Sequence, residues 1–401
     1  MKYDLVFEGG GAKGMAFVGA CAELLEQGHA FGRLLGTSAG AITATLLAAG
    51  YGADEMTAAL AEKDDGKSVF AGFMGDPEPF TDEQIEKSAT LALLDNIDLG
   101  VIPNFIEKGI DVRIARALAK GGRSRHVVSL IERGGWFSAA KFSTWLRAKL
   151  DSGPWRGGNR HFSAFTLGEL FAETGADLSM VASDTTDRRI LVLNHRTAPQ
   201  CPVVSAVRMS MSIPLVWDEV IWNSAWGEYR DRDITGHAIV DGGMLSNFPL
   251  ELFLSDDRMV TAVMGPKQDN PVLGLLIDET LEVKAMAAAR GMLVTVNVKP
   301  AELATIQRLL RLVDTATGAH DNRVIEQYGH LIVRLPAKGY GTTEFDMTEP
   351  RRLALVAEAR AAVKRHFVPK PAMAPAPGTA RGAAPAKPEA ADTVARELLA
   401  L

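Results

Sequence analysis

Over the first fifty residues, short apolar segments typical of strands alternate with segments whose apolar residues recur at helical spacing. Residues 4–7 are predicted as a short buried strand, and apolar positions between residues 15 and 25 recur with helical spacing. The segment FGRLL at residues 31–35 predicts a second strand, and the small-residue segment 41–50 predicts a helix that ends at a glycine. This alternation predicts a largely parallel sheet covered by helices, with functional sites at the carboxyl ends of the strands.

The remainder of the chain predicts an insertion, further strands and a tail. Residues 52–160 are helical in pattern with polar and glycine breaks, which predicts a helical cap. Strands are predicted at residues 179–184, 188–194, 237–241, 274–279, 292–298 and 330–336, and a closing helix at 350–367. Proline and alanine dominate from residue 369, which predicts a flexible tail over residues 369–401. The last ten residues have an amphipathic pattern, but a frayed terminus is favoured over a docked helix because of their short length.

Composition narrows the function classes and the compartment. The chain has 401 residues, 47% of them hydrophobic, and its formal net charge of −6 argues against a nucleic-acid-binding protein. Its two cysteines, Cys21 and Cys201, exclude a disulfide framework and indicate a reducing compartment. Without a signal-like segment or a long apolar run, we expect a soluble, cytoplasmic protein whose contact with a membrane would be peripheral. The sequence gives no indication of an oligomeric state.

The segment GTSAG, residues 36–40, fits the G-x-S-x-G pattern of a nucleophile elbow between a strand and a helix. Such a turn holds its serine on a strained backbone, and it needs glycines where a Cβ atom would collide with the neighbouring turn. The dipole of the following helix favours negative charge near the serine oxygen. Ser38 is therefore the candidate nucleophile. The predicted elbow is completed by Gly36, Thr37, Ala39 and Gly40.

The segment VFEGGGAKG, residues 6–14, places three consecutive glycines after the first predicted strand. The glycines match G-x-G-x-x-G, but dinucleotide binding requires an acidic residue at the end of the second strand, where residues 36–38 supply none. We instead interpret this loop as an oxyanion hole, in which the N–H groups of Gly10 and Gly11 stabilise charge on a carbonyl oxygen. The predicted loop consists of Gly9, Gly10, Gly11, Ala12, Lys13 and Gly14.

A serine nucleophile needs a base, for which histidine is the usual partner. None of the eight histidines lies in a segment typical of catalysis. Asp241 follows an apolar strand, so we expect its carboxylate at the same sheet edge as Ser38, and Gly242 and Gly243 permit a sharp turn after it. To act at neutral pH this carboxylate needs partial desolvation or a short hydrogen bond to the serine. Taken alone, the motif fits an ordinary Asp-Gly turn better.

Three motifs in one order carry a resemblance to the patatin-like phospholipase family: EGGGAKG at residues 8–14, GTSAG at 36–40 and DGG at 241–243. The similarity covers roughly residues 3–250 and continues less distinctly to about residue 367. Supporting similarities lie at SIPLVW, residues 212–217, at Asn247 and Pro249, and at residues 178–189 with Asp184 in the family's acidic position.

The resemblance implies a three-layer α/β/α fold with a mainly parallel sheet, a family domain at residues 1–368 that includes the cap, and a Ser-Asp dyad. Ser38 would be the nucleophile and Asp241 its base in cleaving acyl esters of lipids or phospholipids through an acyl-enzyme, without a cofactor. No spacing typical of a metal site occurs. Several apolar side chains of the cap are candidates for an acyl-chain channel, although ordinary packing is favoured for each one: Phe70, Phe73, Met74, Phe80 and Phe105.

Other functions also fit the sequence. A serine esterase with a Ser-His-Asp triad would use His320, His330 or His366 and would not need Asp241. An acyltransferase would use the same serine but pass the acyl group to an acceptor other than water. A non-catalytic interaction module would keep the fold without the activity.

Overall fold

A central eight-stranded sheet organises the protein, whose computed structural model describes residues 1–90, 117, 119, 121–284, 324–368 and 388–400. The strand order is β11-β12-β8-β2-β1-β13-β14, and β9, which lies off this series, pairs with β8. The strands are β1 (Lys2–Phe7), β2 (Ala30–Thr37), β8 (Leu178–Asp184), β9 (Arg189–Asn194), β11 (Val220–Ile221), β12 (Ala238–Asp241), β13 (Val272–Glu282) and β14 (Ile332–Lys338). The strand predicted at residues 292–298 lies outside the described residues.

The sheet is mainly parallel, as the sequence predicts. β8, β2, β1, β13 and β14 run parallel to their neighbours in that series, whereas β9, β12 and β11 are joined by antiparallel pairing. Crossover helices connect the parallel strands, which is the usual way in which such strands are linked.

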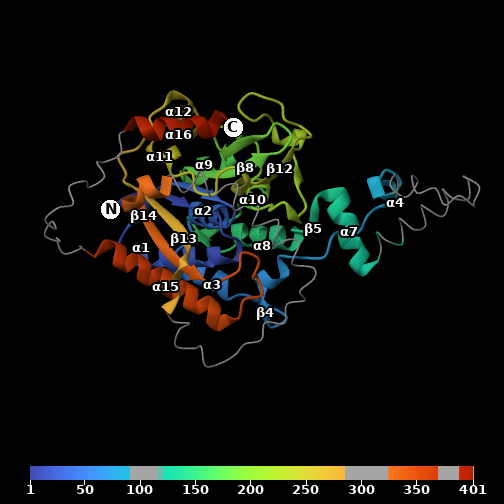
Figure 1. Cartoon of the computed structure of the whole chain (residues 1–401), viewed down its shortest axis with the longest axis horizontal. Helices are drawn as coiled ribbons and strands as arrows, with labels where there is room; N and C mark the ends of the chain where they lie inside the picture. The colour runs from blue at the N-terminus through green and yellow to red at the C-terminus, as the bar shows by residue number, and fades with distance from the viewer. Residues whose placement is uncertain (91–116, 118, 120, 285–323, 369–387, 401) are drawn as a thin grey trace, which may run out of the picture.

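Helices cover both faces of the sheet and give three layers (Figure 1). One face carries α1 (Ala16–Glu26), α2 (Ala39–Ala48), α3 (Ala53–Ala61), α8 (Ala140–Asp151), α9 (Leu167–Thr174), α10 (Val203–Ser210) and α15 (Glu349–Phe367). The other face carries α11 (Glu251–Leu254), α12 (Arg258–Met264) and α16 (Pro388–Ala400). The predicted α/β/α fold class is confirmed.

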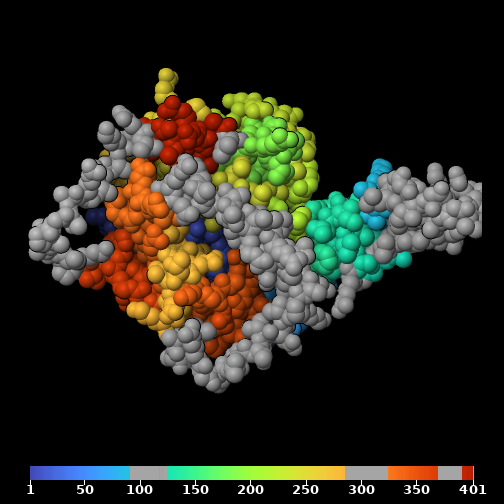
Figure 2. All heavy atoms as spheres, in the orientation of Figure 1, coloured from blue at the N-terminus to red at the C-terminus, as the bar shows by residue number. Residues whose placement is uncertain are grey.

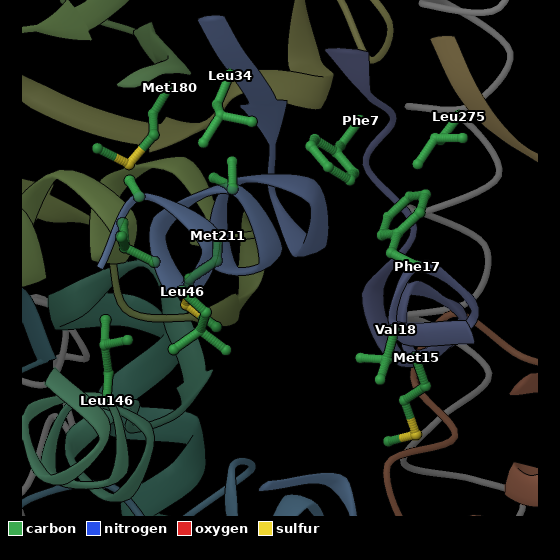
Figure 3. Packing of buried hydrophobic residues seen from close by; sticks show 14 of the residues in the cluster. Phe7, Met15, Phe17, Val18, Leu34, Leu46, Leu146, Met180, Met211 and Leu275 are labelled. Carbon is green, nitrogen blue, oxygen red and sulfur yellow. The ribbon is translucent and has the colours of Figure 1, made fainter. Parts of the chain in front are cut away.

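Successive residues of β1 show how the two cores are separated. Phe7 belongs to the large cluster on the α1 face, where it packs edge-to-face against Phe17 with ring centroids 5.5 Å apart, beside Leu275 of β13 (Figure 3). Val6 points to the opposite cluster beneath α11 and α12. Side chains alternate across a strand, so a sheet buried on both faces needs the continuous apolar runs that the sequence has.

The predicted cap contains short helices and short strand pairs in its described part. Besides α3 and α8, which fall in the same range but belong to the large core cluster, these elements are β3 (Lys63–Asp64), β4 (Lys67–Ser68), η2 (Val69–Gly72), α4 (Asp82–Glu86), α7 (Gly122–Arg133), β5 (Gly135–Phe137), β6 (Pro154–Trp155) and β7 (Gly158–Asn159). β5 pairs in parallel with β10 (Leu215–Trp217), which connects this region to the segment before Asp241. No helix in the described part of the chain is both long and apolar enough to cross a bilayer.

The described end of the chain, residues 388–400, is helical where the sequence predicts a flexible tail, and residues 369–387 and 401 of that tail lie outside the described residues. Residues 388–400 form α16, which packs on α11, α12 and β9 and lies against the body of the molecule (red in Figure 2). Asp392 accepts a hydrogen bond of 2.7 Å from the Ser255 hydroxyl. Tertiary burial stabilises a helix that would be marginal alone. The side chains buried in this contact are Ala391, Ala395 and Leu398.

Candidate active site

The GTSAG segment forms a sharp turn between β2 and α2. Ser38 has φ 52° and ψ −118°, a strained conformation for a residue with a side chain, and only 5% of it is exposed. A Cβ atom on Gly36 would lie 2.4 Å from the backbone of Gly40, and one on Gly40 would lie 2.5 Å from the carbonyl oxygen of Phe7. The turn therefore requires glycine at both positions, with Thr37 and Ala39 on either side of the serine.

Asp241 is the last residue of β12, which runs antiparallel to β8 and ends close to the Ser38 turn. Asp241 pairs with Ala182 of β8, and Thr37, next to Ser38, pairs with the adjacent Val181 on the same edge of β8, because β9 occupies the other edge. The expectation that the two residues share a sheet edge is met, but through an antiparallel strand rather than a parallel one.

The Asp241 carboxyl group is buried and has few polar neighbours. Its Oδ1 accepts a 2.8 Å hydrogen bond from the Gly243 N–H, whereas Oδ2 makes no hydrogen bond of ordinary geometry within the described chain. Burial raises the pKa of Asp241 to about 7, although the nearby Ser38 hydroxyl and the Gly243 N–H both act to lower it. The turn at Gly242 needs glycine, since a Cβ atom there would lie 2.5 Å from the carbonyl oxygen of Val181.

The glycine loop between β1 and α1 lies over this pair. The N–H groups of Gly9, Ala12 and Lys13 donate to backbone oxygens of Asn247, Thr342 and Gly10. In the described structure, the N–H groups of Gly10 and Gly11 have no acceptor. Gly11 has φ 54°, which favours glycine.

Close approach explains other glycines of the loop. A Cβ atom on Gly9 would lie 3.2 Å from Cβ of Ser38, and one on Gly14 would lie 2.4 Å from Cβ of Ala39, so both positions let the loop meet the elbow. Lys13 is buried and forms an ion pair with Glu279 at the end of β13. Its side chain thus fixes the loop to the sheet.

Glu8 and Asn247 connect the glycine loop to the segment that follows Asp241. The Asn247 side-chain amide donates to Glu8 Oε1 at 3.3 Å and to the Gly9 carbonyl at 3.0 Å. Glu8 Oε2 in turn accepts the Ile277 N–H at 2.6 Å. These contacts set the loop relative to Asp241; the sequence resemblance includes both residues, but their contact with each other could not be read from it.

An apolar cavity opens beside Ser38. Phe70 and Phe73 line it, as the channel hypothesis expects, whereas Phe80 belongs to a separate cluster and Met74 packs partly buried against the main core. Phe105 lies outside the described residues. Other lining residues from the helices and the predicted cap are Met15, Ile42, Leu46, Met56, Leu60, Trp145, Met211 and Trp217.

The histidines of the alternative triad do not approach this cavity in the described structure. His330 precedes β14, and His366 contacts Phe367, whose ring lies against Tyr3 at the start of β1. Both lie at the amino end of the parallel strands, opposite the Ser38 edge. His320 lies outside the described residues.

Asp184 forms the centre of a small polar cluster away from the cavity. Asp184, Asp187 and His237 place ligand-type atoms within 4.8 Å of one another. The Asp184 carboxylate is already paired with Arg189 at 3.3 Å and with His237 Nδ1 at 2.9 Å. These partners compensate the burial of the Asp184 carboxylate and hold the turn between β8 and β9.

A strained serine on a sharp turn between a strand and a helix is the geometry of a nucleophile elbow. A family model described as patatin-like phospholipase matches residues 5–254. The chain belongs to the patatin-like phospholipase family, which confirms the resemblance carried by the three motifs.

Several proteins are similar to this chain. YqhO of Bacillus subtilis, described as uncharacterized, is 29% identical over 364 residues, which are 89% of this chain and 94% of YqhO. VipD from Legionella pneumophila is 20% identical with a TM-score of 0.44, covering 91% of this chain and 66% of VipD. ExoU in complex with SpcU from Pseudomonas aeruginosa is 19% identical with a TM-score of 0.36, covering 91% and 51%. The chain thus spans between half and two thirds of these two solved structures.

Proposed function

We propose that the protein is a lipid acyl hydrolase of the phospholipase A or lysophospholipase type, with Ser38 as nucleophile and Asp241 as base. The observation that carries the proposal is the position of a strained, nearly buried serine beside a desolvated carboxylate at the opening of an apolar cavity. The cavity suits an acyl chain because its lining is almost entirely apolar.

The reaction follows from the groups present. Ionised Asp241 accepts the proton of the Ser38 hydroxyl as the oxygen attacks the ester carbonyl, and the new oxyanion is held by the free N–H groups of Gly10 and Gly11. Collapse of this intermediate releases the alcohol, which takes the proton from Asp241, and leaves an acyl-enzyme on Ser38. Water then attacks the acyl carbonyl carbon and loses a proton to Asp241. Collapse of the second intermediate releases the fatty acid, and the departing Ser38 oxygen takes this proton back.

The near-neutral pKa is what makes a carboxylate useful as this base. An ordinary aspartate would be a weak base at pH 7, whereas burial brings the pKa of Asp241 to about 7 and so matches it to the reaction. The rate of acylation should therefore rise with pH through about 7.

Hydrolysis of a p-nitrophenyl ester and of phospholipid micelles tests the proposal, with wild type, Ser38→Ala and Asp241→Asn compared at equal folded concentration. We expect both variants to lose activity, and we expect a fluorophosphonate to label wild type but not Ser38→Ala. Full activity of either variant contradicts the dyad. Activity lost on replacing His330 or His366 but kept in Asp241→Asn would favour the triad instead.

A further inference from the structure

Ser210, the last residue of α10, lies directly beneath the nucleophile turn. Its side chain is completely buried. The Ser210 hydroxyl accepts a 3.0 Å hydrogen bond from the Ser38 N–H and donates a 2.6 Å hydrogen bond to the carbonyl oxygen of Val181. One hydroxyl group therefore joins the backbone of the nucleophile to the strand β8.

The geometry of the turn explains why this hydrogen bond matters. Ser38 stands before the first residue of α2 with a positive φ, and its N–H donates to the Ser210 hydroxyl oxygen. A conformation of this kind persists only where the surroundings determine it, and a buried N–H without an acceptor is costly. Ser210 supplies the acceptor and, through Val181, a fixed point on the sheet.

The same segment also holds the proposed base. The Asp241 N–H donates to the carbonyl oxygen of Ser212 at 2.9 Å. Arg208 fixes this segment by bonding the Ser212 hydroxyl and, at 2.7 Å, the Asp218 carboxylate. Residues 208–212 thus contact the backbone of both residues of the pair.

We propose that Ser210 is a positioning residue whose hydroxyl sets the Ser38 turn at the correct distance and angle from Asp241. It touches no reacting atom; it acts through the backbone of Ser38. This inference rests on the proposed function, because it concerns the geometry of the same nucleophile and base.

Reaction of Ser38 with a fluorophosphonate and hydrolysis of a p-nitrophenyl ester test the inference in Ser210→Ala. We expect both the labelling rate and kcat to fall about 100-fold, the effect of a small misplacement of a reacting group, while KM stays unchanged. Ser210→Thr, which keeps the hydroxyl, should recover most of the lost rate.

Ser179→Ala is the matched control. Ser179 is also buried, lies on β8 and accepts a 3.1 Å hydrogen bond from Asn194, but its hydroxyl has no contact with Ser38. We expect a similar loss of Tm in Ser179→Ala and Ser210→Ala, with wild-type kcat and labelling rate only in the Ser179 variant.

Each outcome separates the two proposals. Wild type that neither hydrolyses the ester nor reacts with the probe contradicts the proposed function. Reactive wild type with an equally reactive Ser210→Ala, or an equal rate loss in Ser179→Ala, overturns the positioning role alone. If Ser210→Ala does not fold, Ser210→Cys gives the same comparison, since the thiol fills the same space but is a weak hydrogen-bond partner.

Discussion

Asp241→Asn should stabilise the protein as it abolishes activity. The substitution keeps the size of the side chain and the Oδ1 atom that accepts the Gly243 N–H, but it removes a buried ionisable group. In wild type, Asp241 must ionise in its buried site to act as the proposed base, whereas asparagine stays neutral. The free energy of unfolding of the two proteins should therefore diverge as the pH rises.

The size of this divergence follows from the pKa of Asp241, whose ordinary value of 3.8 is raised to about 7 by burial. The folded state binds this proton more tightly than the unfolded chain does. The contribution of Asp241 to the free energy of unfolding is therefore greatest below pH 4 and is lost as the pH rises to about 7. At about 1.4 kcal/mol per pH unit, the whole loss is about 4 kcal/mol. Between pH 5 and pH 8, Asp241→Asn should gain about 2.5 kcal/mol relative to wild type.

Urea unfolding of wild type and Asp241→Asn at pH 5, 6, 7 and 8 measures this gain. Asp278→Asn is the control: burial acts to raise the pKa of Asp278, but hydrogen bonds from Thr280 and Arg334 lower it overall. Asp278 is thus ionised in both the folded and unfolded states over this range, and its variant should differ from wild type by a constant amount. A difference between Asp241→Asn and wild type that is equally constant from pH 5 to 8 would refute the argument that burial sets the basicity of Asp241.

Three further changes test other parts of the structure. Gly9→Ala places a Cβ atom 2.1 Å from Asn247 Oδ1, so the fluorophosphonate labelling rate should fall about tenfold or more, while Gly52→Ala, whose Cβ meets no atom within 4 Å, should keep it. Trp145→Leu removes a ring from the cavity wall and should shift relative kcat/KM about tenfold towards longer p-nitrophenyl esters; an unchanged chain-length profile would argue against acyl binding there. Deletion of residues 388–400 should cost about 2 kcal/mol or more of unfolding free energy in urea, with kcat retained, because α16 covers the core on the opposite face.

The sequence predicts best those features that depend on local geometry. The elbow at Ser38 and the loop at Gly9–Gly14 each require glycine at several positions in a short span, so both can be recognised from the sequence pattern. The parallel core of the sheet was predictable for a related reason, because strands buried on both faces need continuous apolar runs.

Features that depend on distant contacts could not be predicted. The antiparallel direction of β12 is set by its pairing with β8, and nothing in the segment before Asp241 indicates that direction. The bond from Ser210 to Ser38 joins residues 172 positions apart, and a lone serine at a helix end gives no signal of it. The helix at residues 388–400 was underestimated because its stability comes from α11 and α12 rather than from its own length.

The basicity proposed for Asp241 depends on the burial of its carboxyl group. Its burial disfavours the charged form of the carboxylate, while apolar side chains line the cavity beside Ser38 and provide a surface for an acyl chain. The Ser38 hydroxyl and the Gly243 N–H oppose this effect only in part, so the pKa remains near neutrality. A more polar site would hold Asp241 as an ordinary, weakly basic carboxylate, and a site without these two donors would raise its pKa further and leave it protonated at pH 7. In the proposed mechanism, the balance between burial and these two donors therefore determines whether Asp241 can act as the base of Ser38 at neutral pH.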